Sequence, residues 1–220
     1  KRERESIEKV LLQNNEISAL FFRYQRKFDA DKAMNDVLYE YQKVNIDGDL
    51  AGRQLDAFRV FMERNTFLLD IQGITGVVIP SAFHANAGAV GIRRLYFQQM
   101  QLKFCYSFEN RKKLFDIDSR FKYNVILAIK DGFTKQFACA FYQHDEEWLF
   151  SERDSQLEYT REFVEKTGGQ YLTFLELNNG QSTQIVLSIY SKSVTFRDCC
   201  EQIGMKLQKQ PTALDMTKDA

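Results

Sequence analysis

Four short apolar runs in the middle of the chain constrain its fold more than any other feature. The run GVVIP begins at Gly76 and ends at Pro80. A short continuous apolar run of this kind is typical of a strand buried on both faces. A helix is expected from about 88 to 101, followed by strands over KFCYSF (103–108), FKYNVILAI (121–129) and KQFACAFYQ. A helix between two buried strands suggests a right-handed crossover, so the sequence predicts an α/β core.

Helical segments are expected on both sides of this core. Residues 1 to about 44 contain no Gly or Pro and repeat apolar residues at three- and four-residue steps, which predicts a long helix. After the turn-rich segment 45–52, a second amphipathic helix is expected up to Gly73. Beyond the core, helices are predicted near 155–167 and around 195–203. The expected parts are a helical segment (1–75), an α/β core (76–143) and an α-rich appendage (144–220).

The composition is that of a globular protein. Hydrophobic residues make up 44% of the 220 residues and charged residues 27%, which argues against a disordered or membrane-spanning chain. No apolar run reaches the length of a membrane span, and the charged N-terminal residues are not followed by the apolar stretch of a signal peptide. We therefore expect a cytoplasmic protein with no membrane partner.

The connection SFENRKKLFDIDSRFKY (107–123) joins two predicted strands and contains an apolar ring, Phe115, among charged residues. Over the whole chain 30 acidic and 30 basic residues cancel, so net charge alone does not indicate a nucleic-acid partner. Between residues 103 and 130, however, seven basic residues stand against three acidic ones, a local charge of +4. A charged run of this kind is often only a solvated surface.

The sequence lacks the local motifs of several enzyme classes. It contains no G-x-S-x-G, no P-loop and no G-x-G-x-x-G, so acyl transfer, nucleotide hydrolysis and nicotinamide chemistry have no signal. His84 and His144 stand sixty residues apart without ligands at metal-site spacing, so no metal site is predicted and each is expected at the surface or in a hydrogen bond. Glu176 lacks the Asp and Lys that would accompany it in a nuclease site, and we expect a solvent-facing carboxylate on a strand.

Several segments occur in an order that matches one family. They are LAGRQLDAFRVFMERN, GITGVVIPSAFHAN, IRRLYF and SFENRKKLFDIDSRFKYNVILAI, of which the ENRKKLF and SRFK block is the specific part. In this order they resemble the second half of the catalytic domain of gamma-class DNA adenine-N6 methyltransferases, of the type IIG restriction-modification and BREX phage-defence kind. The resemblance covers about residues 17–220, and GGQYLTFLEL resembles the family segment leading toward target recognition. It implies a bacterial protein with a partial doubly wound, Rossmann-like sheet and S-adenosylmethionine as the cofactor of the parent enzyme.

The resemblance also assigns expectations to individual residues. Phe115 holds the place of the ring that stacks on the flipped-out adenine; without the resemblance, a core anchor would be favoured. Asp56 and Pro80 fall near the cofactor pocket, while a capping or structural role for Asp56 and a strand-ending role for Pro80 stay open. The residues expected to contact DNA phosphates are Arg111, Lys112, Lys113, Arg120 and Lys122.

Two motifs of the family are absent from the sequence. There is no F-x-G-x-G cofactor loop, and the only prolines, Pro80 and Pro211, exclude the (N/D/S)-P-P-(Y/F/W) tetrapeptide. We therefore expect a methyltransferase fragment without catalytic residues of its own, which does not bind S-adenosylmethionine or methylate DNA alone. Its expected partners are double-stranded DNA, the remainder of the methyltransferase and, through an exposed sheet edge, a second copy. The alternative is a non-catalytic DNA-binding or protein-interaction module that retains part of the fold.

Overall fold

The computed structural model describes residues 2–52, 55–151, 153 and 155–205. Residues 206–220, the C-terminal end of the region that the family resemblance covers, lie outside the described residues. The chain divides into two compact units, residues 1–178 and 179–220. Within the described part, none of the helices combines the length and the apolar character needed to cross a membrane.

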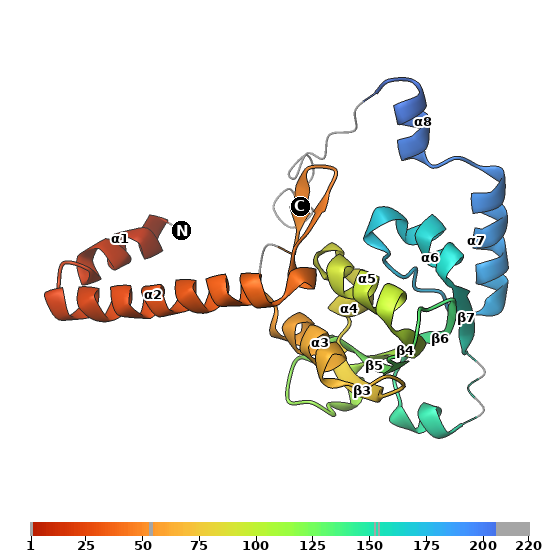
Figure 1. Cartoon of the computed structure of the whole chain (residues 1–220), viewed down its shortest axis with the longest axis horizontal. Coiled ribbons are helices and arrows are strands. Elements are labelled where there is room, and N and C mark those ends of the chain that lie inside the picture. Colours follow the sequence, from red (N-terminus) through yellow and green to blue (C-terminus); the bar gives the residue numbers. More distant parts are fainter. Residues whose placement is uncertain (1, 53–54, 152, 154, 206–220) are drawn as a thin grey trace. The chain divides into compact units, whose positions relative to one another are not determined.

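The first unit begins with two helices, α1 (Arg2–Leu11) and α2 (Asn15–Leu38) (Figure 1). The side chain of Asn14 caps α2 by accepting hydrogen bonds from two first-turn amides at 3.0 and 3.2 Å. Asparagine favours this capping position because its side-chain oxygen replaces a missing helical acceptor. The prediction of one continuous helix over 1–44 is therefore wrong.

A small hairpin replaces the turn-rich segment expected at 45–52. Strands β1 (Val44–Ile46) and β2 (Asp49–Ala51) pair in antiparallel register across Asp47 and Gly48. Both turn residues have positive φ, 52° and 86°, the geometry for which an Asp-Gly pair is favoured in a two-residue hairpin turn. The second predicted helix follows as α3 (Ala57–Leu68).

The core is a five-stranded mixed sheet, which confirms the predicted α/β class. In spatial order its strands are β3 (Ile74–Pro80), β5 (Lys122–Ile129), β4 (Gln101–Glu109), β6 (Gln136–Gln143) and β7 (Leu157–Thr160). β4 and β6 are parallel, whereas β5 is antiparallel to both β3 and β4. β3, β4 and β6 therefore run in the same direction, and their carboxyl ends lie at one edge of the sheet.

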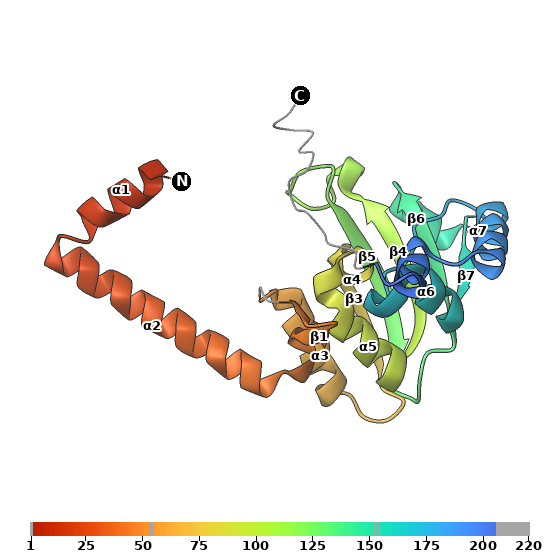
Figure 2. The same ribbon diagram turned by 90° about the horizontal axis from the view of Figure 1, so that it is seen from above.

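Helices cover one face of this sheet. Figure 1 shows α3, α4 (Ala82–Ala85), α5 (Val90–Gln99) and α6 (Arg161–Gly168) on the same side of the strands, and the turned view in Figure 2 places them in front of the sheet. The ring of Phe97 on α5 meets Phe137 on β6 edge to face, with centroids 5.8 Å apart. β7 was missed in the sequence: the helix predicted near 155–167 is a strand followed by α6.

The opposite face is covered only in part. The short helix η4 (Glu146–Phe150) places Trp148 edge-on against Tyr106 and Phe108, with centroids 5.0 and 6.1 Å apart. The other short 3-10 helices within the described residues are η1 (Glu40–Gln42), η2 (Ala87–Ala89), η3 (Asn110–Lys112) and η5 (Gly169–Tyr171).

β3 is an edge strand, so the prediction that both of its faces are buried is wrong. Thr75 and Ile79 are buried, whereas Ile74 and Val78 on the other face are 61% and 55% exposed. Among the described strands β3 pairs only with β5. A short apolar run cannot by itself distinguish a central strand from an edge strand, and the terminal Pro80 is typical of an edge.

The second unit contains α7 (Gly180–Lys192) and α8 (Phe196–Gln202). Asn179 caps α7 by accepting from the Ser182 amide at 2.9 Å, and Thr195 caps α8 by accepting from the Asp198 amide at 3.1 Å. α8 confirms the last helix predicted around 195–203.

Candidate functional site

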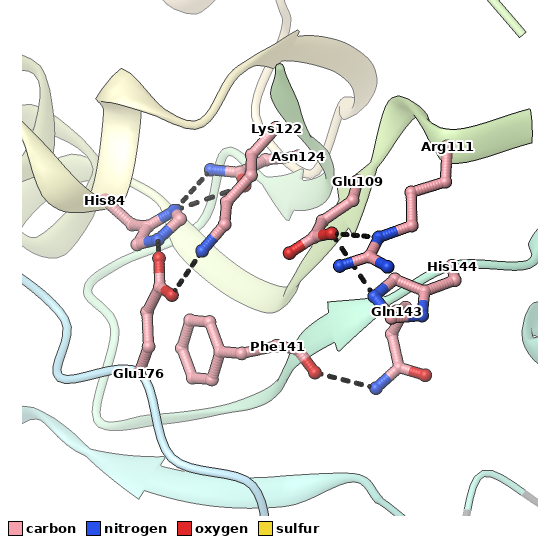
Figure 3. A network of polar contacts seen from close by, with 9 residues as sticks. All are labelled: His84, Glu109, Arg111, Lys122, Asn124, Phe141, Gln143, His144 and Glu176. Atoms are coloured by element: carbon pink, nitrogen blue, oxygen red, sulfur yellow. Dashed lines mark hydrogen bonds and ion pairs between the residues drawn. The ribbon is translucent and has the colours of Figure 1, made fainter. Parts of the chain in front are cut away.

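Titratable and hydrogen-bonding side chains gather at the carboxyl edge of the sheet (Figure 3). His84 lies on α4, directly after β3, while Glu109 ends β4 and Tyr142 lies at the end of β6. The antiparallel strand β5 starts at the same edge and contributes Lys122 and Asn124. Open α/β sheets generally bind ligands at this edge.

The innermost group, which we call the His84 cluster, consists of His84, Asn124, Glu176 and Lys122. His84 is fully buried, and its Nε2 lies 2.9 Å from Glu176 Oε1. On its other side, Nδ1 lies 3.1 Å from Asn124 Oδ1 and 2.9 Å from Nδ2, so either tautomer finds a partner in the amide. The second carboxylate oxygen of Glu176 accepts a hydrogen bond from Lys122 Nζ at 2.7 Å.

The shared carboxylate is strongly acidic. The hydrogen bond from His84 and the ammonium of Lys122 lower the pKa of Glu176 to about 2, against the opposing effect of burial. Glu176 therefore stays ionised over the whole physiological range. Its position on the irregular segment after α6 ties that segment to the edge of the sheet.

The expectation of a solvent-facing carboxylate on a strand is wrong for Glu176. No strand forms there, and its side chain is mostly buried. The sequence holds one signal of this inward orientation, because Phe174, two residues before Glu176, is apolar. Phe174 packs in the core, and its ring centroid lies 6.2 Å from that of His84. His84 itself fulfils the expectation of a hydrogen-bonding histidine.

A second polar group lies farther out at the same edge. Glu109 accepts a hydrogen bond from Arg111 Nε at 2.5 Å, and His144 Nε2 lies 3.3 Å from the same carboxylate. The hydrogen bond from Arg111 is the main cause that lowers the pKa of Glu109. Between the two groups, Lys122 Nζ lies 4.5 Å from the ring centroid of Tyr142, within cation-π distance.

Tyr142 has an unusual backbone for a strand residue. Its φ is 59°, in the left-handed region that few non-glycine residues adopt. The pairing of β6 with β4 shifts register at this point, between Tyr106 and Phe108. Burial and a hydrogen bond with Glu176 raise the pKa of the Tyr142 hydroxyl, so this phenol is held against the His84 cluster.

Phe115 lies in the connection between β4 and β5 at this edge. Its ring meets Tyr123 edge to face, with centroids 5.1 Å apart and an interplanar angle of 80°. The residue nevertheless remains 37% exposed. Part of the ring is therefore anchored on the sheet, as in the core-anchor interpretation, and part is accessible to another molecule.

Most of the basic residues near Phe115 have acidic partners. Arg111 pairs with Glu109, Lys112 with Asp145, Arg120 with Asp118 and Lys122 with Glu176, at N–O distances of 2.5 to 2.7 Å. Lys113 has no ion pair among the described residues. Glu109 and Asp118 are already counted in the local charge of +4, so the partners from outside the stretch, Asp145 and Glu176, compensate half of it.

Asp56 and Pro80 lie in different surroundings. Asp56 occupies the N-cap position of α3, but its side chain makes no capping hydrogen bond. It lines a cleft of about 490 Å³ together with Phe58, Ala82 and Asn86, a volume in the range of small-molecule sites. Pro80 ends β3, two residues before Ala82, and does not itself line this cleft.

Neither a protein-family model nor a curated protein matches the chain significantly. Solved structures are similar to it in part. One is a chain from a structural study of complex assembly and conformational transition of the type I R-M system. It is 16% identical to this chain, has a TM-score of 0.46 and matches over 67% of this chain. Others are a modification subunit of a putative type I restriction enzyme from Vibrio vulnificus YJ016 (13%, 0.43, 58% of this chain) and the M protein of the type I restriction enzyme EcoKI (13%, 0.44, 74% of this chain).

The chain spans less than half of each of these proteins, namely 38%, 33% and 47% of their lengths. The matches to the modification subunit and to the M protein are thus partial on both sides.

Proposed function

We propose that this chain forms the target-base and DNA-contacting side of an S-adenosylmethionine-dependent DNA adenine methyltransferase, in a bacterial restriction-modification or phage-defence system. The observation that carries the proposal is that Phe115, at the carboxyl edge of the sheet, packs its ring against Tyr123 and yet remains 37% exposed. An adenine inside a duplex cannot present its amino group to a methyl donor, so the base must be flipped out. A flat ring offsets the lost stacking by about 1–3 kcal/mol.

The basic residues around the loop are proposed to hold the DNA backbone. Arg111, Lys112 and Arg120 have exposed side chains whose ion pairs lie at the surface. Such pairs contribute about 0–1 kcal/mol, so exchanging a carboxylate for a phosphate costs little. Lys113 has no ion pair among the described residues, so a phosphate would not have to replace a described carboxylate there. Lys122 is the least available of the set, because Glu176 and Tyr142 both hold its ammonium group.

The cofactor of the parent enzyme would approach the cleft beside Asp56. S-Adenosylmethionine supplies the methyl group, and it carries hydroxyl and ammonium donors that a carboxylate recognises. Asp56 makes no capping bond and faces the cleft with its carboxylate close enough to act electrostatically on Arg59, and Pro80 would close the strand next to this site. Because the chain has no F-x-G-x-G segment, we expect no saturable binding of S-adenosylmethionine by the chain alone, measured by titration calorimetry.

The open edge of β3 is proposed to receive the remainder of the methyltransferase. Apolar side chains are exposed on both sides of this strand, with Ile74 and Val78 on one face and Phe61 and Leu68 on the neighbouring helix α3. An unpaired edge with apolar neighbours is a template for a further strand. A second copy of the chain is the other occupant of this edge, and sedimentation with and without added parent fragments distinguishes the two.

The base-stacking role is tested by fluorescence anisotropy with two labelled duplexes, one fully paired and one with a single extrahelical adenine. The wild-type chain is expected to prefer the extrahelical base, and Phe115→Ala to lose about 5- to 150-fold of that preference. Leu114→Ala is the matched control, because Leu114 is exposed on the same loop without a ring. Equal affinity of the wild-type chain for both duplexes, or full methylation by a parent enzyme carrying Phe115→Ala, would sink the proposal.

A second candidate function is a non-catalytic DNA-binding or protein-interaction module that retains part of the fold. The local pairing of the basic residues and the open β3 edge favour the protein-interaction form. Salt dependence separates the two candidates, since a protein that contacts several phosphates loses DNA affinity steeply as salt rises. A chain that binds neither duplex at low salt but associates through β3 would support the second candidate.

A further inference from the structure

The geometry points to Asn110 as the positioning residue of the Phe115 loop, the connection over residues 110–121. We infer that its amide fixes the loop conformation in which the Phe115 ring is both anchored and accessible. This inference rests on the proposed stacking role of Phe115. Asn110 was not singled out in the sequence, although it stands only five positions before the ring.

The Asn110 side chain makes three hydrogen bonds to the backbone of the loop. Its Oδ1 accepts from the Phe115 amide at 3.0 Å, and its Nδ2 donates to the carbonyls of Phe115 and Ile117 at 2.8 and 3.3 Å. The residue is 1% exposed. The amide therefore lies inside the loop and satisfies both backbone groups of the residue that carries the proposed platform.

The backbone of Asn110 ties the two ends of the loop as well. Its amide donates to the Phe121 carbonyl at 2.9 Å, and its carbonyl accepts from the Lys113 amide at 3.0 Å. Lys113 adopts φ of 53°, the left-handed conformation that reverses the chain after η3. The start, the middle and the end of the loop are thus all bonded to one residue.

Only an amide of this length satisfies the three side-chain contacts. The Phe115 amide requires an acceptor, and the two carbonyls require donors. Aspartate would offer acceptors alone and would bring a buried charge against two carbonyl oxygens, while alanine would leave all three groups without this partner. Leu114 and Ile117 on either side of Phe115 are 57% and 51% exposed, so packing of these neighbouring side chains fixes the loop less than buried side chains would.

The test is a double-mutant cycle with Asn110→Ala and Phe115→Ala, read as the preference for a duplex with one extrahelical adenine over a paired duplex. Asn110→Ala alone is expected to lower the preference about tenfold, with affinity for the paired duplex within about twofold because phosphate contacts remain. In the Phe115→Ala background, Asn110→Ala is expected to change the preference no further. A merely structural role would lower both affinities together and would overturn the inference. Asn14→Ala is the control, since it removes a capping amide far along the sequence.

Two failures are distinguishable in this cycle. If Phe115→Ala keeps the full preference, the proposed function is wrong. If Phe115→Ala removes the preference but Asn110→Ala keeps it, only the inference on Asn110 is wrong. Should Asn110→Ala not fold, hydrogen exchange of the wild-type chain decides: the Phe115 amide is expected to exchange at least tenfold more slowly than the Leu114 amide. Equal exchange rates of these two amides would contradict the hydrogen bond to Asn110.

Discussion

The His84 cluster and the Phe115 loop lie at the same edge of the sheet, yet they use charge in opposite ways. In the cluster, one carboxylate is shared by His84 and Lys122 at distances of 2.9 and 2.7 Å, and the histidine is fully buried. In the loop, ion pairs such as those of Arg120 with Asp118 and of Lys112 with Asp145 lie at the surface. In the account proposed above, the cluster stabilises the fold, whereas the loop keeps groups available for a partner.

The two regions differ in the free energy that is needed to break their ion pairs. Breaking a buried pair leaves an uncompensated charge or polar group inside the protein, which costs about 3–5 kcal/mol. Breaking an exposed pair costs about 0–1 kcal/mol, since water replaces the lost partner. Mutations in the cluster should therefore change stability, and mutations in the loop should change binding.

The largest expected effect is that of His84→Ala. It removes a fully buried ring that contacts Asn124 and Glu176, so we expect a loss of about 3–4 kcal/mol in the free energy of unfolding, measured with urea. His144→Ala is the matched control, because His144 lies near Glu109 at the surface and should cost less than about 0.5 kcal/mol. Similar losses for the two histidines would remove the distinction between the buried cluster and the exposed polar groups at the same edge.

The second-largest expected effect is that of acid on the stability contributed by the His84 cluster. The pKa of Glu176 is about 2 in the folded chain, below its ordinary value of 4.5, so the folded state binds its proton less readily than the unfolded state. The stability contributed by Glu176 is thus complete above pH 4.5 and is lost as pH falls from there toward 2. Urea unfolding at several pH values should show a shallower acid loss in Glu176→Gln than in the wild type. Parallel pH profiles would mean that Glu176 does not carry this stability.

A smaller effect on stability is expected from Phe115→Ala. The ring is only partly buried against Tyr123, so the cost should be about 1 kcal/mol. Phe137→Ala provides the comparison, because Phe137 is buried in the core and should cost about 3–5 kcal/mol. If Phe115→Ala were as costly as Phe137→Ala, the ring would be a core anchor and not an accessible platform.

The smallest expected effect is that of Arg120→Gln on stability. Its side chain is 89% exposed, and we expect no resolvable change in the midpoint of urea unfolding. In DNA binding, the same substitution should reduce the slope of log affinity against log salt by about 1, the contribution of one phosphate contact. Glu162→Gln, which breaks an exposed pair on α6, should leave that slope unchanged.

The sequence predicted the strands of the core well because each is a short apolar run that can be recognised from neighbouring residues alone. β4, β5 and β6 lie where the apolar runs indicated, within one or two residues. The edge position of β3 was not predictable in this way, since it depends on which strands pair. The three-part division at 75/76 and 143/144 stays a prediction.

The candidate site was predictable only where its residues are neighbours in the chain. Phe115 and the basic residues form one continuous stretch, and the family resemblance pointed to it. The contact between His84 and Glu176 spans 92 residues, and no periodicity reports a contact of that separation. Asn110 is a local case that went unnoticed, because an asparagine in a polar loop gives no sign of which backbone groups its amide satisfies.

The central claim, that the Phe115 loop receives an extrahelical adenine, is tested most directly with 2-aminopurine as the extrahelical base of a duplex. Stacking on an aromatic ring should quench its fluorescence when the wild-type chain binds. We predict quenching by the wild type and none by Phe115→Ala at a concentration where anisotropy shows that the variant is bound. The same fluorescence change with both proteins would contradict the claim.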